Sequence, residues 1–205
     1  MHGSALSFAA EVEHQIEALS NEDYHKRRGR SKLLLEEWYP ISRLALHLKQ
    51  PGLHIEVQAF GDDGVADGRI TQKGFRERIF DIQVTFVDDY EEALRRELLQ
   101  SQGIAPGAGP IARSKQSRAI IATPVVVDYD DEINKTAAGI AERFQKKIKI
   151  SYSTGTVLLI AFDSVTLLGR SAWNKLFAAV DKKNQFCPKQ LQHSLHFELC
   201  HKRTH

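Results

Sequence analysis

The stretch TVLLIAFD, residues 156–163, is almost entirely apolar, and it constrains the fold more than any other segment. A strand with one solvent-facing side alternates apolar and polar residues, whereas a strand buried on both faces does not. We therefore expect 156–163 to be a central strand of a sheet. Helices are predicted on both sides of this strand in the sequence, at 129–148 and at 171–183, because apolar residues recur there with helical spacing.

Other patterned segments alternate between helical and strand-like periodicity. Helices are predicted at 6–20, 31–49 and 89–102, and strands at 51–60, 65–70, 77–86 and 119–127. The helix at 31–49 should be interrupted or kinked at Pro40, because proline removes a hydrogen-bond donor. Pro124 similarly argues that the apolar run 119–127, otherwise typical of a buried strand, lies at an edge or a bulge. This order predicts an α/β fold, a three-layer sandwich with a central mixed sheet.

The length of 205 residues fits one main domain. We expect an N-terminal helix and basic linker at 1–30, an α/β core at 31–184 and a His- and Cys-containing tail at 185–205. Hydrophobic residues make up 42% and charged residues 26% of the chain, which is typical of a soluble globular protein. The net charge of +2 excludes a polycation. No apolar run suits a membrane span and no basic region opens a signal peptide, so a cytoplasmic protein is expected, with self-association left open.

The strand at 77–86 carries an unusual polar face. Phe80, Ile82, Val84 and Phe86 alternate with Asp81, Gln83 and Thr85, and Asp67 lies upstream beside a glycine. Carboxylates on adjacent strands can hold Mg²⁺, which prefers oxygen ligands, if both side chains face the same way. The plain alternatives are a solvated strand face and an ordinary turn residue.

The turn ADG (66–68) and the following DIQV (81–84) carry a family resemblance. They resemble the core motif of the PD-(D/E)XK nuclease superfamily, in which a Pro-Asp-Gly-like turn precedes Asp/Glu-X-Lys on the next strand. The resemblance covers roughly residues 31–165 and implies a restriction-endonuclease-like fold. It also implies that Asp67 and Asp81 bind Mg²⁺ or Mn²⁺, that the Ile82 carbonyl is a further ligand, and that Glu36 or Glu37 is the helical carboxylate of some members.

The chain departs from the family motif at two positions. Ala66 stands in place of the proline, and Gln83 stands in place of the lysine. A lysine can orient the attacking water and stabilise the phosphate, whereas a neutral amide can only donate and accept hydrogen bonds. Three functions therefore remain open. The first is a metal-dependent phosphodiester hydrolase with Asp67, Asp81, Gln83 and Glu36 as catalytic residues. The second is a degenerate nuclease-fold module that binds nucleic acid or protein, and the third is an α/β protein that binds a small ligand and has no nuclease ancestry.

Clustered cations indicate nucleic acid, with DNA expected, as the partner. HKRRGRSK (25–32) holds five cations in eight residues. The candidate phosphate contacts come from one loop and one helix: Arg113, Lys115, Arg118, Arg143, Lys146 and Lys147. A solvated helix face is the alternative for the helical group.

The tail contains Cys187, His193, His196, Cys200, His201 and His205. These residue types bind Zn²⁺, but the paired close spacings of zinc fingers are missing. A histidine-rich terminus without bound metal is the alternative interpretation.

Overall fold

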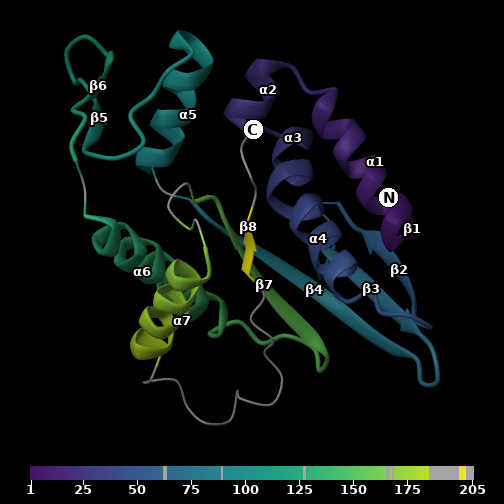
Figure 1. Cartoon of the computed structure of the whole chain (residues 1–205). Helices are drawn as coiled ribbons and strands as arrows, with labels where there is room; N and C mark the ends of the chain where they lie inside the picture. The colour runs from purple at the N-terminus through teal and green to yellow at the C-terminus, as the bar shows by residue number, and fades with distance from the viewer. Residues whose placement is uncertain are drawn as a thin grey trace.

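The computed structural model describes residues 1–61, 64–88, 90–126, 128–164, 167, 169–184 and 199–201. Its middle layer is a six-stranded mixed sheet (Figure 1). The strands lie in the order β1 (His2–Ser4), β2 (His54–Ala59), β3 (Gly68–Lys73), β4 (Arg78–Val87), β7 (Thr156–Phe162) and β8 (Leu199–His201). The first four pair antiparallel, and β4, β7 and β8 pair parallel. The predicted α/β class and mixed sheet are confirmed.

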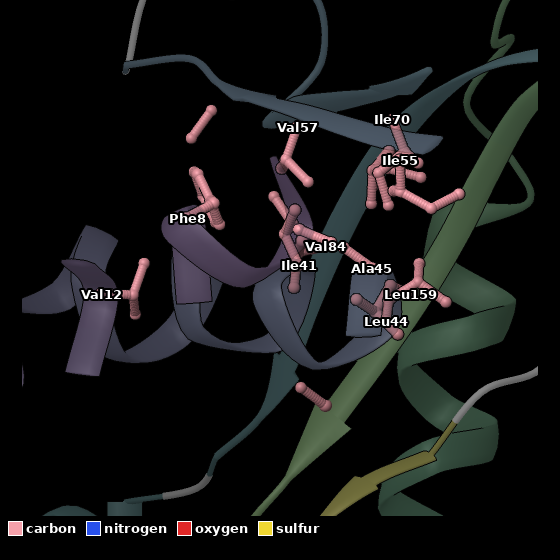
Figure 2. Close-up of a cluster of buried hydrophobic side chains, with 14 of the residues drawn as sticks. Phe8, Val12, Ile41, Leu44, Ala45, Ile55, Val57, Ile70, Val84 and Leu159 are labelled. Carbon is pink, nitrogen blue, oxygen red and sulfur yellow. The ribbon is translucent and has the colours of Figure 1, made fainter. Parts of the chain in front are cut away.

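One face of the sheet packs against the N-terminal helices α1 (Ala5–Glu17) and α4 (Tyr39–His47). Phe8 and Val12 of α1 and Ile41 of α4 meet Val57 and Val84 from the sheet in one buried cluster (Figure 2). Residues from the first thirty positions thus belong to the same core as the strands. Burial of this shared apolar surface holds the N-terminal helix against the sheet.

The opposite face packs against α6 (Tyr129–Lys147) and α7 (Arg170–Asn184). Alternate residues of β7 divide between the two cores: Leu159 joins the N-terminal cluster, while Leu158 and Ile160 join the cluster of α6 and α7. Because β7 is covered on both faces and lies between β4 and β8, its prediction as a central strand is confirmed. Helices on both faces are compatible with a three-layer sandwich.

The strand predicted at 119–127, at an edge or a bulge because of Pro124, is mostly absent. Only β6 (Ile120–Ala122) forms there, and it pairs with β5 (Ile111–Arg113) in a small two-stranded sheet outside the main one. This sheet packs against α5 (Tyr90–Gln102) through Leu94, Leu98 and Ile111. Pro124 supplies no N–H for a longer ladder, and Val126 is exposed. The apolar run therefore forms only a short hairpin beside α5 and adds no strand to the main sheet.

The predicted interruption near Pro40 takes the form of a π-helical segment. Two short helices, α2 (Asn21–Lys26) and α3 (Arg30–Lys32), lead into η1 (Leu33–Trp38), which continues directly into α4. The Tyr39 N–H bonds the carbonyl of Leu34, five residues back, where an α-helix would use a four-residue step. This wider turn carries Glu36 and Glu37.

No helix in the described part of the chain is long and apolar enough to cross a bilayer.

Candidate functional site

Asp67 lies immediately before β3 and is fixed by both neighbouring strands. Its N–H donates to the Ile82 carbonyl on β4, and its own carbonyl accepts from Phe60 N–H after β2, each at 2.9 Å. Gly68 follows because a Cβ there would meet the Gln58 carbonyl and the Ile41 side chain, both at 2.9 Å. The Asp-Gly pair thus marks the point where β3 passes closely under α4.

The Asp67 side chain reaches across to β4. Its Oδ2 accepts hydrogen bonds from Gln83 Nε2 and from the backbone N–H of Val84, both at 2.6 Å. Gly68 pairs with Ile82 in the antiparallel register, so Asp67 stands opposite Gln83 at the next position. The carboxylate therefore continues the ladder beyond the end of β3, where no β3 residue remains to pair with Val84.

Asp81 lies on the same face of β4 as Gln83, two residues away. Its cross-strand partner is Arg69, whose Nε donates to Asp81 Oδ1 at 2.7 Å. The two predicted carboxylates are therefore on diagonal neighbours, a relationship that places the residues roughly 7–8 Å apart, with the Cβ atoms somewhat closer. The Ile82 carbonyl already accepts the Asp67 N–H within the ladder, and its role as a metal ligand stays a prediction.

A pocket of about 450 Å³ opens over this polar face of β4. Asp81 and Gln83 form its floor, and Lys147 and Tyr152, from the end of α6 and the following loop, form its wall. We call it the carboxylate pocket. Its polar floor and cationic wall are suited to an anionic ligand, and the Asp81 carboxylate, with Asp67 bonded to the neighbouring Gln83, is suited to a cation.

Burial raises the pKa of Asp67 above its ordinary value, while the Val84 N–H, the Lys147 charge and the Gln83 amide oppose that rise. Burial, with the negative charge of Asp67, also raises the pKa of Tyr152. The Tyr152 hydroxyl is buried, and no hydrogen-bond partner reaches it from the described residues. Asp67, Lys147 and Tyr152 are thus electrostatically linked across the carboxylate pocket.

Glu36 lies in a neighbouring pocket of about 560 Å³, which we call the basic pocket. The wall includes Val84 and Thr85 of β4 together with Lys147, which also lines the carboxylate pocket. Burial raises the pKa of Glu36, and the positive charge of Arg27 partly offsets this. Glu36, predicted as a helical carboxylate, therefore faces the same edge of β4 as Asp67, and Glu37 also lines this pocket.

The structure separates the predicted nucleic-acid contacts into two groups. Arg113 lies on β5, Lys115 and Arg118 lie in the turn before β6, and Arg113 is ion-paired with Glu97. This hairpin stands beside α5, away from the β3–β4 hairpin (Figure 1).

On α6, the predicted cations divide by helical face. Arg143 and Lys147, four residues apart, line the basic pocket, and Arg143 also donates to the Asp88 carbonyl at 2.7 Å. Lys146 instead pairs with Glu142 on the exposed side. Only part of the predicted cationic set therefore surrounds the polar face of β4.

Several residues of the two pockets were not predicted. Arg69 was hidden in an ordinary strand pattern, and Tyr152 in a short polar loop. Arg27 belongs to the basic run 25–32, whose clustered cations as a whole indicate nucleic-acid contact, and the burial of this one side chain was not predicted. The strand register would have found Arg69 as the partner of Asp81, but no local pattern indicates Tyr152 or the burial of Arg27.

The predicted zinc ligands Cys187, His193, His196 and His205 lie outside the described residues, and Cys200 and His201 fall within β8. Across the described ranges, no three His, Cys, Asp or Glu side chains come close enough together to form a metal cluster. Comparisons with protein families, with curated proteins and with solved structures find no match to this chain.

Proposed function

We propose that the protein is a divalent-metal-dependent phosphodiester hydrolase acting on nucleic acid, with a restriction-endonuclease-like core. The observation that carries this proposal is the meeting of Asp67, Asp81, Gln83 and Lys147 around one polar face of β4. Carboxylates beside an amide and a lysine are the groups that phosphodiester hydrolysis needs in one place.

The order of the elements supports the same proposal. The helices η1 and α4 precede an antiparallel run of β2, β3 and β4, and α5, the helix predicted from Asp89, follows this run. The small β5–β6 sheet and α6 then lie between α5 and β7, which pairs parallel with β4. The sequence resemblance implies a helix, three strands, a helix and a strand in this order. Asp67 stands at the start of the middle strand, and Asp81 on the next.

The donor set fits a hard divalent cation. Asp67 uses one oxygen for both of its hydrogen bonds, and Asp81 uses Oδ1 for Arg69. No other hydrogen-bond donor reaches the second oxygen of either carboxylate from the part of the chain that the structure describes. Mg²⁺ or Mn²⁺ would be held by Asp67 and Asp81, with the Ile82 carbonyl and Glu36 as the further candidates.

Each nearby side chain has a defined chemical role in this proposal. The metal would lower the pKa of a water molecule and neutralise charge on the scissile phosphate. Gln83 holds Asp67 in position through its Nε2 and keeps its carbonyl oxygen to orient water. Lys147, at the end of α6, supplies the positive charge that the family motif places at position 83.

Cleavage by the Asp81→Ala variant tests the proposal. The wild-type protein should cleave DNA or RNA in Mn²⁺ and not in EDTA, and Asp81→Ala should lose this activity. Glu77→Ala, which removes an exposed carboxylate from the β3–β4 turn, is the matched control and should cleave normally. Undiminished metal-dependent cleavage by Asp81→Ala would contradict the assignment.

A second function is favoured by one observation: the ion pair between Arg69 and Asp81 leaves the pocket without a free pair of carboxylates. A non-cleaving member that binds nucleic acid through its cations would retain this pair. Calorimetric titration with Mn²⁺ separates the two functions. Binding that Asp67→Ala abolishes favours the hydrolase, whereas nucleic-acid binding without any Mn²⁺ binding favours the module.

A further inference from the structure

The basic pocket borders the part of β4 that β3 does not reach. The register of β3 with β4 ends at Gly68 and Ile82, so the edge of β4 beyond Val84 faces this pocket. Three carboxylates line the pocket, and they are outnumbered two to one by the cations Lys26, Arg27, Lys32, Arg96, Arg143 and Lys147. The excess of positive charge favours an anionic ligand.

Arg27 is the most deeply placed of these cations. It is only 8% exposed, and its guanidinium lies 5.2 Å from the centre of the Phe86 ring. Nη2 donates to Asp163 at 2.7 Å, and Nη1 lies 4.0 Å from Glu36 Oε1. The buried Nε and Nη1 nevertheless have no hydrogen-bond partner among the described residues. The backbone of Arg27 is left-handed, with φ of 46°, a conformation that costs free energy in a residue other than glycine.

Arg96 lies on α5 at the far side of the same pocket. Its two terminal nitrogens donate to both oxygens of Asp88, at 2.9 and 2.5 Å. Its buried Nε, like those of Arg27, finds no partner within the described ranges. The carboxylates Asp88 and Asp163 therefore fix the two guanidinium groups without using all of their donors.

A buried N–H without an acceptor destabilises the folded protein, and it does so more strongly when the group is charged. We propose that the basic pocket binds a phosphate group, whose oxygens accept from Arg27 and Arg96 and whose charge Lys32 and Lys147 balance. Phosphate suits the site because it is a small anion with several acceptor oxygens, and their geometry matches the donors of a guanidinium group.

The identity of the ligand as a nucleic-acid phosphate rests on the proposed function, although the binding itself needs no metal. Lys147 lines both pockets, so a phosphate in the basic pocket would lie next to a strand held over Asp81 and Gln83. The source is either the terminal phosphate of a strand or a phosphate within its backbone. Free inorganic phosphate shares the same chemistry.

The test is a titration of the full-length protein with inorganic phosphate in EDTA at constant ionic strength, followed by ³¹P NMR. We expect saturable binding that Arg27→Gln weakens at least tenfold, as for the loss of charge-assisted hydrogen bonds. Arg28→Gln is the control, because the neighbouring Arg28 is exposed and does not line the pocket. Circular dichroism establishes that each variant is folded.

Lys32→Ala keeps the test decisive if Arg27→Gln does not fold, since Lys32 is exposed and lines the same pocket. It should weaken phosphate binding severalfold and leave the circular dichroism spectrum unchanged. Absence of binding at tens of millimolar phosphate, or binding that neither variant weakens, would overturn the inference. These outcomes are independent of cleavage, because EDTA removes the metal that the proposed hydrolase requires.

Oligonucleotides with and without a 5′-phosphate then separate the two sources, in fluorescence anisotropy titrations under the same metal-free conditions. Tighter binding of the phosphorylated strand, lost in Arg27→Gln, assigns the pocket to a strand end. Equal affinities that Arg27→Gln lowers together assign it to the backbone. Affinities that are equal and insensitive to Arg27→Gln count against a nucleic-acid phosphate.

Discussion

Gln83 donates a 2.6 Å hydrogen bond to Asp67, so the residue in the position of the motif lysine is bonded to the proposed metal ligand. The same oxygen of Asp67 completes the ladder at Val84 N–H. Asp67 therefore has a structural role as well as a proposed catalytic one. The predictions below separate the two roles.

Asp67→Asn should be at least as stable as the wild-type protein at neutral pH. Burial raises the pKa of Asp67 in the folded state, so ionisation of this carboxyl disfavours folding. The stability that comes from the raised pKa of Asp67 is fully present below the pKa of this carboxyl in the unfolded chain. It is lost as the pH rises through the pKa of Asp67 in the folded protein. Asparagine keeps an oxygen for Val84 N–H and carries no charge. Urea unfolding between pH 3 and pH 8 measures the difference.

The advantage of Asp67→Asn should shrink as the pH falls, because the wild-type carboxyl then becomes neutral as well. Asp67→Ala, which removes the acceptor of Val84 N–H, should be less stable than Asp67→Asn throughout this range. A neutral-pH stability loss in Asp67→Asn as large as that in Asp67→Ala would show that the charge itself is required for folding.

Lys147→Ala should lower kcat by about a hundredfold, as expected when one charged group is removed from a developing anion. Lys146→Ala is the matched control, since Lys146 precedes it on α6 but pairs with Glu142 on the exposed side. Single-turnover cleavage in Mn²⁺ measures both variants. Equal rates for the two variants would remove Lys147 from the proposed site.

Gln83→Lys should restore part of the activity that Lys147→Ala loses. A lysine at position 83 would place its charge beside Asp67, where the amide now donates its hydrogen bond. The measurement compares cleavage by the double variant with that of Lys147→Ala alone, and Gln83→Met in the same background is the control for side-chain length. Restoration by methionine as well would exclude a charge effect.

Arg69→Ala should tighten Mn²⁺ binding about two- to fivefold. Its guanidinium competes with a metal for Asp81, and an exposed ion pair of this kind stabilises only weakly, so the gain in metal affinity is small. Calorimetric titration gives the two dissociation constants. Arg76→Ala, the control, removes one positive charge from the β3–β4 turn and should leave the Mn²⁺ dissociation constant nearly unchanged. An equal change in Mn²⁺ affinity in Arg76→Ala would indicate a general electrostatic effect instead of competition for Asp81.

Gly68→Ala should lower the free energy of unfolding by about 1–3 kcal/mol, because the added methyl group overpacks a closed contact. It would press on the Gln58 carbonyl and the Ile41 side chain. Gly107→Ala meets no atom within 4 Å and should change stability by less than about 0.5 kcal/mol. Chemical denaturation of both variants measures the contrast. Equal losses would show that the Gly68 contact is not a steric limit.

Much of the main sheet could be predicted because periodicity reports how each element is buried. The unbroken apolar run of β7 and the alternation of β4 indicate their burial directly. The same criterion failed at 119–127, because apolar composition does not reveal whether a covering layer exists, and the structure leaves Val126 exposed. Pairing Asp67 with Gln83 depended on strand register, which a sequence pattern does not contain.

The cationic residues were harder to predict, because a charge pattern does not indicate which side chain turns inward. Lys146 and Lys147 are adjacent lysines on the same helix, yet only Lys147 lines the two pockets. Arg27 is buried within a run of charged residues, since a left-handed backbone and Asp163 from a distant segment hold it there. Such contacts come from the assembled tertiary structure.

The π-helical turn at η1 has a consequence for the rotational phase of the whole N-terminal segment. Each α-helical residue rotates about 100° around the helix axis. One extra residue in a turn therefore changes which side chains before η1 lie on the same side of the helix as the apolar face of α4. Deleting one residue from Leu33–Trp38 would restore a uniform α-helix and turn everything before it relative to α4. Arg27 would then lose its alignment with Asp163, while the apolar stripe of α4 could remain on the sheet. The geometry of the basic pocket is therefore set by a single-residue insertion in a helix.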